Sequence, residues 1–253
     1  MHDPGLVSIS FRDQTPEAIL LACKTANLKF IEWGSDLHAP CHDIAQLEYI
    51  AALQKQYGIS CCSYGTYFRL GHSPIEELPQ YIHAAKILGT NILRLWAGRK
   101  KASDCTEEER ATFIEQCKQA TAIAEKHDVI LCLECHRRSY TETKEGALEL
   151  IEAIHSPHFQ MYWQPNPDIS LADNLDYLAT LSPYITHIHV FNWTADQRLP
   201  LKDGVHSWHE YLSILPGQHH LLLEFMPDDQ IESLPVEADT LRKIIHIATV
   251  RNT

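Results

Sequence analysis

The run Val-Ile-Leu-Cys-Leu-Glu-Cys at residues 129–135 is apolar apart from one carboxylate near its end. It is too short for a typical helix. It follows a long amphipathic stretch that begins at the capping box Thr106-Glu107-Glu108-Glu109 and ends near Lys126. This order predicts a helix followed by a buried strand at 129–134, with Glu134 at the carboxyl end of the strand.

The same alternation of short apolar strands and amphipathic helices extends in both directions along the chain. The expected strands cover residues 6–11, 30–33, 59–64, 91–96, 129–134, 160–164, 185–191 and 220–225. The expected helix starts include Thr15 with Pro16, Asp43, and a second capping box at Ser207-Trp208-His209-Glu210. Eight such units in 253 residues are typical of a (β/α)8 barrel, which has about 250 residues.

The predicted fold class is therefore α/β, a single (β/α)8 TIM barrel that occupies residues 1–253 as one domain. A doubly wound sheet is the alternative, but no Gly-x-Gly-x-x-Gly turn follows the first strand. No linker or low-complexity segment divides the chain. In such a barrel the functional site lies at the carboxyl ends of the strands.

Composition narrows the class of partner. The chain has 21 Lys+Arg and 33 Asp+Glu, a formal charge of −12, which disfavours binding to nucleic acid. No apolar run approaches the ~20 residues of a transmembrane helix, and the N-terminus lacks a secretion-signal pattern, so we expect a cytoplasmic protein without a membrane partner. Cys132 and Cys135 have CxxC spacing but would face opposite sides of a strand, so we expect reduced, buried cysteines.

Polar residues gather where the predicted strands end. Glu32, Glu134, Gln164, His189 and Glu224 each follow an apolar run, late in the second, fifth, sixth, seventh and eighth strands. A buried charge without a partner costs several kcal/mol. Carboxylates that converge on one barrel mouth therefore indicate a shared cation.

Four of these residues form a candidate metal site. Glu134, Gln164, His189 and Glu224 supply two carboxylates, one amide oxygen and one imidazole, which suit one divalent ion such as Mn²⁺, Zn²⁺, Mg²⁺ or Co²⁺. His187 lies two residues before His189, on the same face and deeper, and is expected to be a core or supporting residue.

Four segments carry a resemblance to a known family. They are Leu133-Glu134-Cys135-His136 with Thr141 and Thr143, Thr186-His187-Ile188-His189-Val190-Phe191-Asn192, Leu222-Leu223-Glu224, and Leu93-Arg94-Leu95-Trp96-Ala97-Gly98. In order and spacing they resemble the fifth-, seventh-, eighth- and fourth-strand segments of the xylose-isomerase-like sugar phosphate isomerase/epimerase superfamily. The resemblance covers essentially the whole chain.

The resemblance implies one divalent metal, held by Glu, Asp, His and Glu on the fifth to eighth strands, and therefore by Glu134, His189 and Glu224 here. The sixth strand departs from the pattern, because Gln164 stands in place of the aspartate and Pro167 replaces a histidine that often follows. Asn192 likewise stands where the seventh strand often ends in aspartate. The neutral Gln164 is expected to weaken metal binding.

Two glutamates beside a Lewis acid suit proton transfer next to a carbonyl. We expect a metal-dependent isomerase or epimerase of a small sugar, keto-sugar or cyclitol, phosphorylated or not, that acts through an enediolate with Glu134 and Glu224 as the acid/base pair. The candidate substrate contacts are Glu32, His38, Tyr64, Trp96, His136, Arg137 and Asn166, with Arg12, Trp33 and Trp163 as further candidates.

Three other functions remain open. Loss of hydroxide after proton abstraction would make the chain a dehydratase, as in relatives that act on inosose. The neutral Gln164 also fits a non-catalytic sugar-binding barrel. The 16 histidines also suggest a type IV apurinic endonuclease, which binds three metals. Pro167, in place of a histidine, and the acidic net charge argue against this function. A homo-oligomer is compatible with the sequence.

Overall fold

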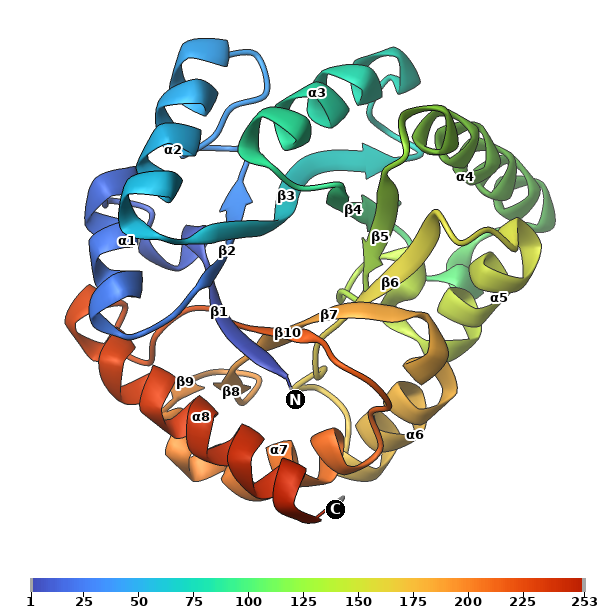
Figure 1. The fold of residues 1–253 in the computed structure, drawn as a ribbon. Coiled ribbons are helices and arrows are strands. Elements are labelled where there is room, and N and C mark those ends of the chain that lie inside the picture. Colours follow the sequence, from blue (N-terminus) through green and yellow to red (C-terminus); the bar gives the residue numbers. More distant parts are fainter. Residues whose placement is uncertain (1, 252–253) are drawn as a thin grey trace.

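A computed structural model describes residues 2–251, and within them eight parallel strands close into a barrel inside a ring of eight helices (Figure 1). Around the barrel the order is β1-β2-β3-β4-β5-β6-β7-β10, and β10 pairs with β1 to close it. A two-stranded hairpin, β8 with β9, is inserted after β7. The (β/α)8 barrel predicted from the sequence is confirmed.

The strands are β1 Asp3–Val7, β2 Phe30–Gly34, β3 Ser60–Leu70, β4 Ile92–Ala97, β5 Ile130–Glu134, β6 Phe159–Trp163, β7 Ile185–Val190, β8 Asn192–Trp193, β9 Arg198–Leu199 and β10 His220–Leu223. The helices are α1 Pro16–Thr25, α2 Ile44–Tyr57, α3 Leu78–Leu88, α4 Glu107–His127, α5 Lys144–Ile154, α6 Leu171–Leu181, α7 Val205–Ser213 and α8 Leu234–Arg251. Between residues 2 and 251 no helix combines the length and apolar character that crossing a membrane requires.

Side-chain caps explain several helix starts. The Thr106 hydroxyl accepts from the Glu109 backbone N–H, and the Glu109 carboxylate accepts from Thr106, so the capping box that opens α4 is confirmed. The prediction of a second capping box, at Ser207 to Glu210, is wrong. Helix α7 begins at Val205, directly after a 3-10 turn over Leu201–Gly204, and its first residue has no side-chain cap.

Two strands differ from the expected ranges. Strand β1 ends at Val7, and residues 8–11 form a 3-10 turn instead of its continuation. The hydroxyls of this turn accept from the end of β2 and from the loop after β10: Ser8 Oγ accepts from Gly34 N at 2.9 Å, and Ser10 Oγ accepts from Phe225 N at 2.8 Å. Strand β3 runs on to Leu70, past a register shift against β4.

The alternation of side chains along each strand creates two apolar layers. A large layer fills the space between the barrel and the helices, and a smaller cluster fills the barrel interior. Cys132 lies in the interior cluster and Cys135 in the outer layer, so the CxxC pair faces opposite sides as predicted. All eight cysteines are free thiols.

Candidate active site

The four residues expected to share a metal lie at neighbouring strand ends. Glu134 is the last residue of β5, Gln164 follows β6, His189 is the penultimate residue of β7, and Glu224 follows β10. All four are buried, with exposed fractions between 0 % for His189 and 9 % for Gln164. The barrel therefore brings them together at its carboxyl end.

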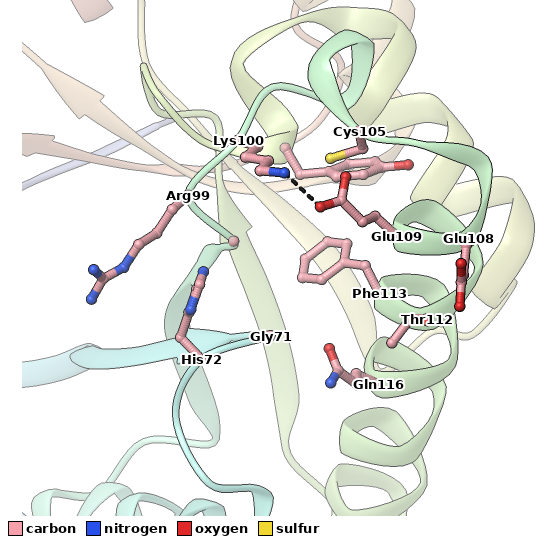
Figure 2. Close-up of a pocket in the computed structure, with 12 residues that line it drawn as sticks. Gly71, His72, Arg99, Lys100, Cys105, Glu108, Glu109, Thr112, Phe113 and Gln116 are labelled. Atoms are coloured by element: carbon pink, nitrogen blue, oxygen red, sulfur yellow. Dashed lines mark hydrogen bonds and ion pairs between the residues drawn. The ribbon is translucent and has the colours of Figure 1, made fainter.

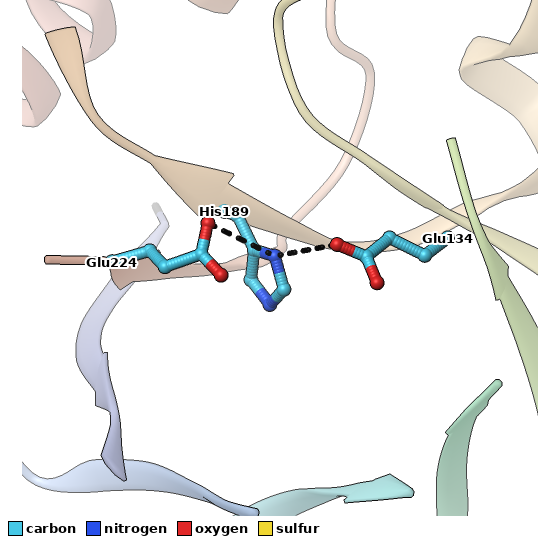
Figure 3. A group of neighbouring side chains, drawn as sticks. All are labelled: Glu134, His189 and Glu224. Carbon is cyan, nitrogen blue, oxygen red and sulfur yellow. Dashed lines mark ion pairs between the residues drawn. The ribbon is translucent and has the colours of Figure 1, made fainter. Parts of the chain in front are cut away.

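His189 lies at the centre of this group. Its Nδ1 atom is 3.6 Å from Glu134 Oε1, 3.7 Å from Glu224 Oε2 and 3.2 Å from Gln164 Oε1. Figure 3 shows Glu134 and Glu224 approaching the same ring nitrogen from opposite sides. Glu134, His189 and Glu224 each offer one ligand atom, and these three atoms lie within 4.8 Å of one another.

A buried arginine, Arg94, pairs with two of the acids at this site, although the sequence did not identify it as a site residue. Arg94 Nε donates to Glu32 Oε1 at 2.9 Å, and Arg94 Nη1 donates to Glu134 Oε2 at 2.5 Å. The arginine is 2 % exposed and both carboxylates are almost fully buried. Gly65 makes room for the pair, because a Cβ atom there would lie 2.5 Å from Glu32 Oε1 and 2.8 Å from Arg94 Nη2.

The two glutamates beside His189 have pKa values shifted in opposite directions. Burial opposes ionisation of Glu134, but Arg94, His189 and His136 together outweigh it and hold the pKa of Glu134 well below its usual range. Burial raises the pKa of Glu224, and the neighbouring charge of Glu134 raises it further, against the opposing effect of His189. Glu134 is therefore ionised at neutral pH, whereas Glu224 is the carboxyl group closer to carrying a proton.

His189 is held in its charged form by the acids around it. Burial alone would lower its pKa, but Glu224, Glu32 and Glu134 together raise the pKa of His189 to about 10. Glu32 is the third acid, with Oε1 3.5 Å from His189 Nε2. The imidazolium thus supplies positive charge among three carboxylates, and binding of a cation at Nδ1 would displace its proton.

The donor set fits a divalent cation. Ligand atoms bound to one ion at 2.0–2.2 Å in tetrahedral or octahedral geometry are themselves about 2.8–3.6 Å apart. The oxygens around His189 Nδ1 lie at 3.2–3.7 Å, close to that spacing. Three carboxylates and the Arg94 guanidinium carry a net charge of −2 when the imidazole is neutral, which one divalent ion balances. Glu134, His189 and Glu224 would hold it, with the Gln164 amide oxygen as a neutral fourth donor.

Two of the candidate substrate contacts adjoin this group. The Trp96 indole N–H donates to Glu134 Oε2, and the His136 ring lies 5.8 Å from the Trp96 ring. Arg69, not foreseen from the sequence, lies over that indole, with its Cζ atom 4.1 Å from the ring centroid. Trp96 and His136 therefore flank the mouth next to Glu134.

Other candidates take structural contacts in this structure. Tyr64 is fully buried, packs against Tyr81 of α3 and donates its hydroxyl to Ala39 O at 2.5 Å. Trp33 and Trp163 are also fully buried, against Gln54 and against Trp208 with Tyr211 respectively. These three face the helices and not the barrel mouth.

The remaining candidates make loop contacts or support the site. Glu32 is fully buried with Arg94 and Ser63, and His38 Nδ1 lies 3.2 Å from Ser8 Oγ. Arg137 pairs with Asp168 at 3.0 Å, and Asn166 Oδ1 accepts from Asp168 N. Arg12 pairs with Asp36 and donates to Tyr67 OH. His187 is a core residue whose Nε2 lies 3.1 Å from Cys62 O, as expected.

A family model described as the xylose isomerase-like TIM barrel matches residues 20–244. The chain belongs to this family. The match agrees with the resemblance drawn from the strand-end motifs and with the barrel in Figure 1.

Two of the proteins to which this chain is similar are described as dehydratases. A curated 3-dehydroshikimate dehydratase from Bacillus anthracis is 27% identical over 124 residues, which are 47% of this chain and only 42% of that enzyme. The crystal structure of a probable 3-DHS dehydratase from Bacillus anthracis has a TM-score of 0.76 at 20% identity, covering 96% of this chain and 99% of that one.

Two further solved structures share the barrel. An L-ribulose 3-epimerase has a TM-score of 0.74 at 16% identity, covering 100% of this chain and 96% of that one. The IolI protein, whose structure contains a zinc atom, has a TM-score of 0.72 at 14% identity, with 98% of each chain covered. Likeness at these identities shows a common fold.

Proposed function

We propose that this chain is a metal-dependent enzyme that moves a proton at the carbon next to the carbonyl of a small polyhydroxylated ketone, and so isomerises or epimerises it. The substrate class is a sugar, keto-sugar or cyclitol. Glu134 and Glu224 are the proposed acid/base pair. A bound divalent ion would polarise the substrate's carbonyl and hydroxyl oxygens and stabilise developing negative charge.

The observation that carries this proposal is the placement of two glutamates on opposite sides of His189, in environments that push their pKa values apart (Figure 3). Such a pair of carboxyl groups is typical of an acid and a base that act on one substrate. Glu134, kept ionised by Arg94, accepts the proton from carbon. Glu224, whose pKa is raised, delivers a proton to the other face.

Dehydration is the second candidate. It also needs one base and one acid, and Glu134, which accepts from Arg94 and Trp96, is the glutamate placed to act as the base. The curated relative matched over about half of this chain is itself a dehydratase. In this reaction Glu134 removes the proton from carbon, the neighbouring C–O bond breaks as the C=C bond forms, and Glu224 protonates the departing hydroxyl to release water.

One experiment separates these outcomes. The metal-loaded protein is incubated in deuterated water with ketoses, inososes and 3-dehydroshikimate, and products are followed by mass spectrometry and NMR. Epimerisation or isomerisation introduces solvent deuterium next to the carbonyl, whereas dehydration lowers the mass by one water.

The variants Glu134→Gln and Glu224→Gln should slow the reaction at least ~10²-fold, the usual contribution of a positioned acid or base. Glu237→Gln is the matched control, because Glu237 is another buried glutamate but accepts from Leu201 N, away from the site. Equal rates in wild type and all three variants would refute the catalytic assignment and favour a sugar-binding barrel.

A further inference from the structure

Three basic side chains meet beside the barrel mouth. Arg69 is in β3, His72 lies in the loop after β3, and Arg99 lies in the loop after β4. The two loops are tied together, because Gly98 N donates to Leu70 O at 3.1 Å and Arg69 Nη1 donates to Gly98 O at 2.7 Å. Figure 2 shows Arg99 and His72 next to each other at one side of a pocket of about 410 Å³ that both line.

These side chains, the basic cluster, form no direct ion pair with an acid among the described residues, although the net charge of the protein is −12. Among the residues whose side chains the structure describes, no carboxylate lies within 4 Å of Arg69 or Arg99, as the ion pairs show. Lys100 differs, because it lines the same pocket but reaches across to Glu109 Oε1 at 2.5 Å (Figure 2). Two unpaired guanidinium groups held near one another leave positive charge that an anion would neutralise.

The titration behaviour of the cluster agrees with its geometry. Burial, and next the charge of Arg99, lower the pKa of Arg69, against the opposing charge of Glu134. Burial, followed by Arg99 and Arg69, lowers the pKa of His72. The charge of Arg99 therefore disfavours the protonated forms of Arg69 and His72, and a bound anion would relieve that repulsion.

The basic cluster is adjacent to the acid/base group. The Arg69 guanidinium stacks on the Trp96 ring, 4.1 Å from its centroid, and the indole N–H of Trp96 donates to Glu134. A single indole therefore separates Arg69 from the proposed base. Trp96 thus contacts both the basic cluster and Glu134.

We propose that Arg69, His72 and Arg99 bind an anionic oxygen group of the substrate, a carboxylate or a phosphate. This inference rests on the proposed function and narrows its substrate class from polyhydroxylated ketones in general to those that carry a negative charge. The planar guanidinium groups suit two-pronged recognition of such a group, and His72 adds a ring N–H donor.

The first test needs neither metal nor turnover. Inorganic phosphate and D-gluconate are titrated separately into the protein without added metal, and the His72 ring resonances are followed by NMR across pH 5–8. At least one anion should bind and raise the pKa of His72. Phosphate alone indicates a phosphorylated substrate, and gluconate alone indicates a carboxylic acid.

Arg99→Gln is the decisive variant, because Arg99 is exposed and its replacement should not disturb folding. It should weaken anion binding at least ~5-fold, whereas Lys100→Gln removes the same charge from the same pocket and should change it less than ~2-fold. The proposal is overturned when neither anion shifts the pKa of His72, or when Arg99→Gln and Lys100→Gln weaken anion binding equally.

The second test uses turnover. With an anionic ketose, Arg99→Gln should raise KM about 10-fold with little change in kcat, whereas Lys100→Gln should raise KM less than ~2-fold. Unchanged KM for every active anionic ketose overturns the proposal while the proposed chemistry stands. Anion binding that depends on Arg99, in a protein inactive toward every ketone, refutes the proposed function and leaves the anion site in place.

Discussion

Replacing Arg94 should destabilise the protein more than any substitution of a surface charge. Arg94 is 2 % exposed, and it donates to two carboxylates that are almost fully buried, on Glu32 and Glu134. In Arg94→Gln both acids lose the guanidinium that they share, and the His189 imidazolium is left as their counter-charge inside the barrel. Residue 65 cannot carry a side chain that replaces the arginine, because a Cβ atom added to Gly65 would already collide with Glu32 and Arg94.

The magnitude follows from the burial of the pair. Removing one partner of a buried ion pair costs about 3–5 kcal/mol, and here one guanidinium serves two acids. We therefore expect a loss near ~4–5 kcal/mol, a large share of the ~5–15 kcal/mol that stabilises a typical protein. Arg110→Gln is the control, because its pair with Glu149 is 41 % and 29 % exposed and should contribute less than ~1 kcal/mol.

The assay is urea unfolding at pH 7 and at pH 5. In the wild type, burial raises the pKa values of Glu32 and Glu134, but Arg94, helped by His189, holds them below their usual range, so the contribution of Arg94 is present above about pH 4.5 and is lost as the pH falls. In the variant both pKa values rise and the acids take up protons sooner, so the difference between the two proteins should narrow at pH 5. If Arg94→Gln does not fold, Glu32→Gln with Arg94→Gln should recover part of the loss. A difference below ~1 kcal/mol at pH 7 would refute this reasoning.

Three further outcomes are expected. Gly65→Ala should lower the free energy of unfolding by roughly 1–3 kcal/mol, because its Cβ would meet Glu32 and Arg94 at 2.5 and 2.8 Å; an unchanged denaturation midpoint contradicts this. Gln164→Asp should tighten Mn²⁺ or Zn²⁺ binding at least ~10-fold by calorimetry, and unchanged affinity would mean that Gln164 is not a ligand. Burial lowers the pKa of His2 from 6.5 to about 4, so the stability that its neutral form supplies above pH 6.5 is lost as the pH falls toward 4. His2→Gln should accordingly flatten the fall of Tm over that range, and an equally steep fall contradicts the assignment.

The barrel and the strand-end residues were predictable because both depend on local pattern. Each strand–helix unit shows in hydrophobic periodicity, and parallel strands in a closed barrel bring their carboxyl ends to one mouth. The convergence of Glu134, Gln164, His189 and Glu224 follows from that alone.

The alternation of side chains along a strand also indicates which aromatic residues face away from the site. If Glu32 faces the barrel interior, its neighbour Trp33 must face the helices, and the structure places both so. The same rule puts Trp163 outside when Gln164 faces the site. Applying it would have removed Trp33 and Trp163 from the candidate substrate contacts.

Contacts across the barrel could not be predicted in the same way. A lone arginine within the apolar run of β4 is a visible signal, but its partners come from β2 and β5. Their distances depend on how the closed barrel staggers its strands, which local sequence does not encode. The basic cluster likewise depends on two loops that a backbone hydrogen bond between Gly98 and Leu70 holds together.

The most direct test of the central claim is a crystal structure of the protein soaked with Mn²⁺ or Zn²⁺, with anomalous difference maps to locate the ion. We expect one strong peak within about 2.0–2.6 Å of the carboxylates of Glu134 and Glu224 and of His189 Nδ1, and its loss in His189→Gln crystals. A map with no peak among these residues, or with the ion bound elsewhere in the barrel, would contradict the proposed metal centre.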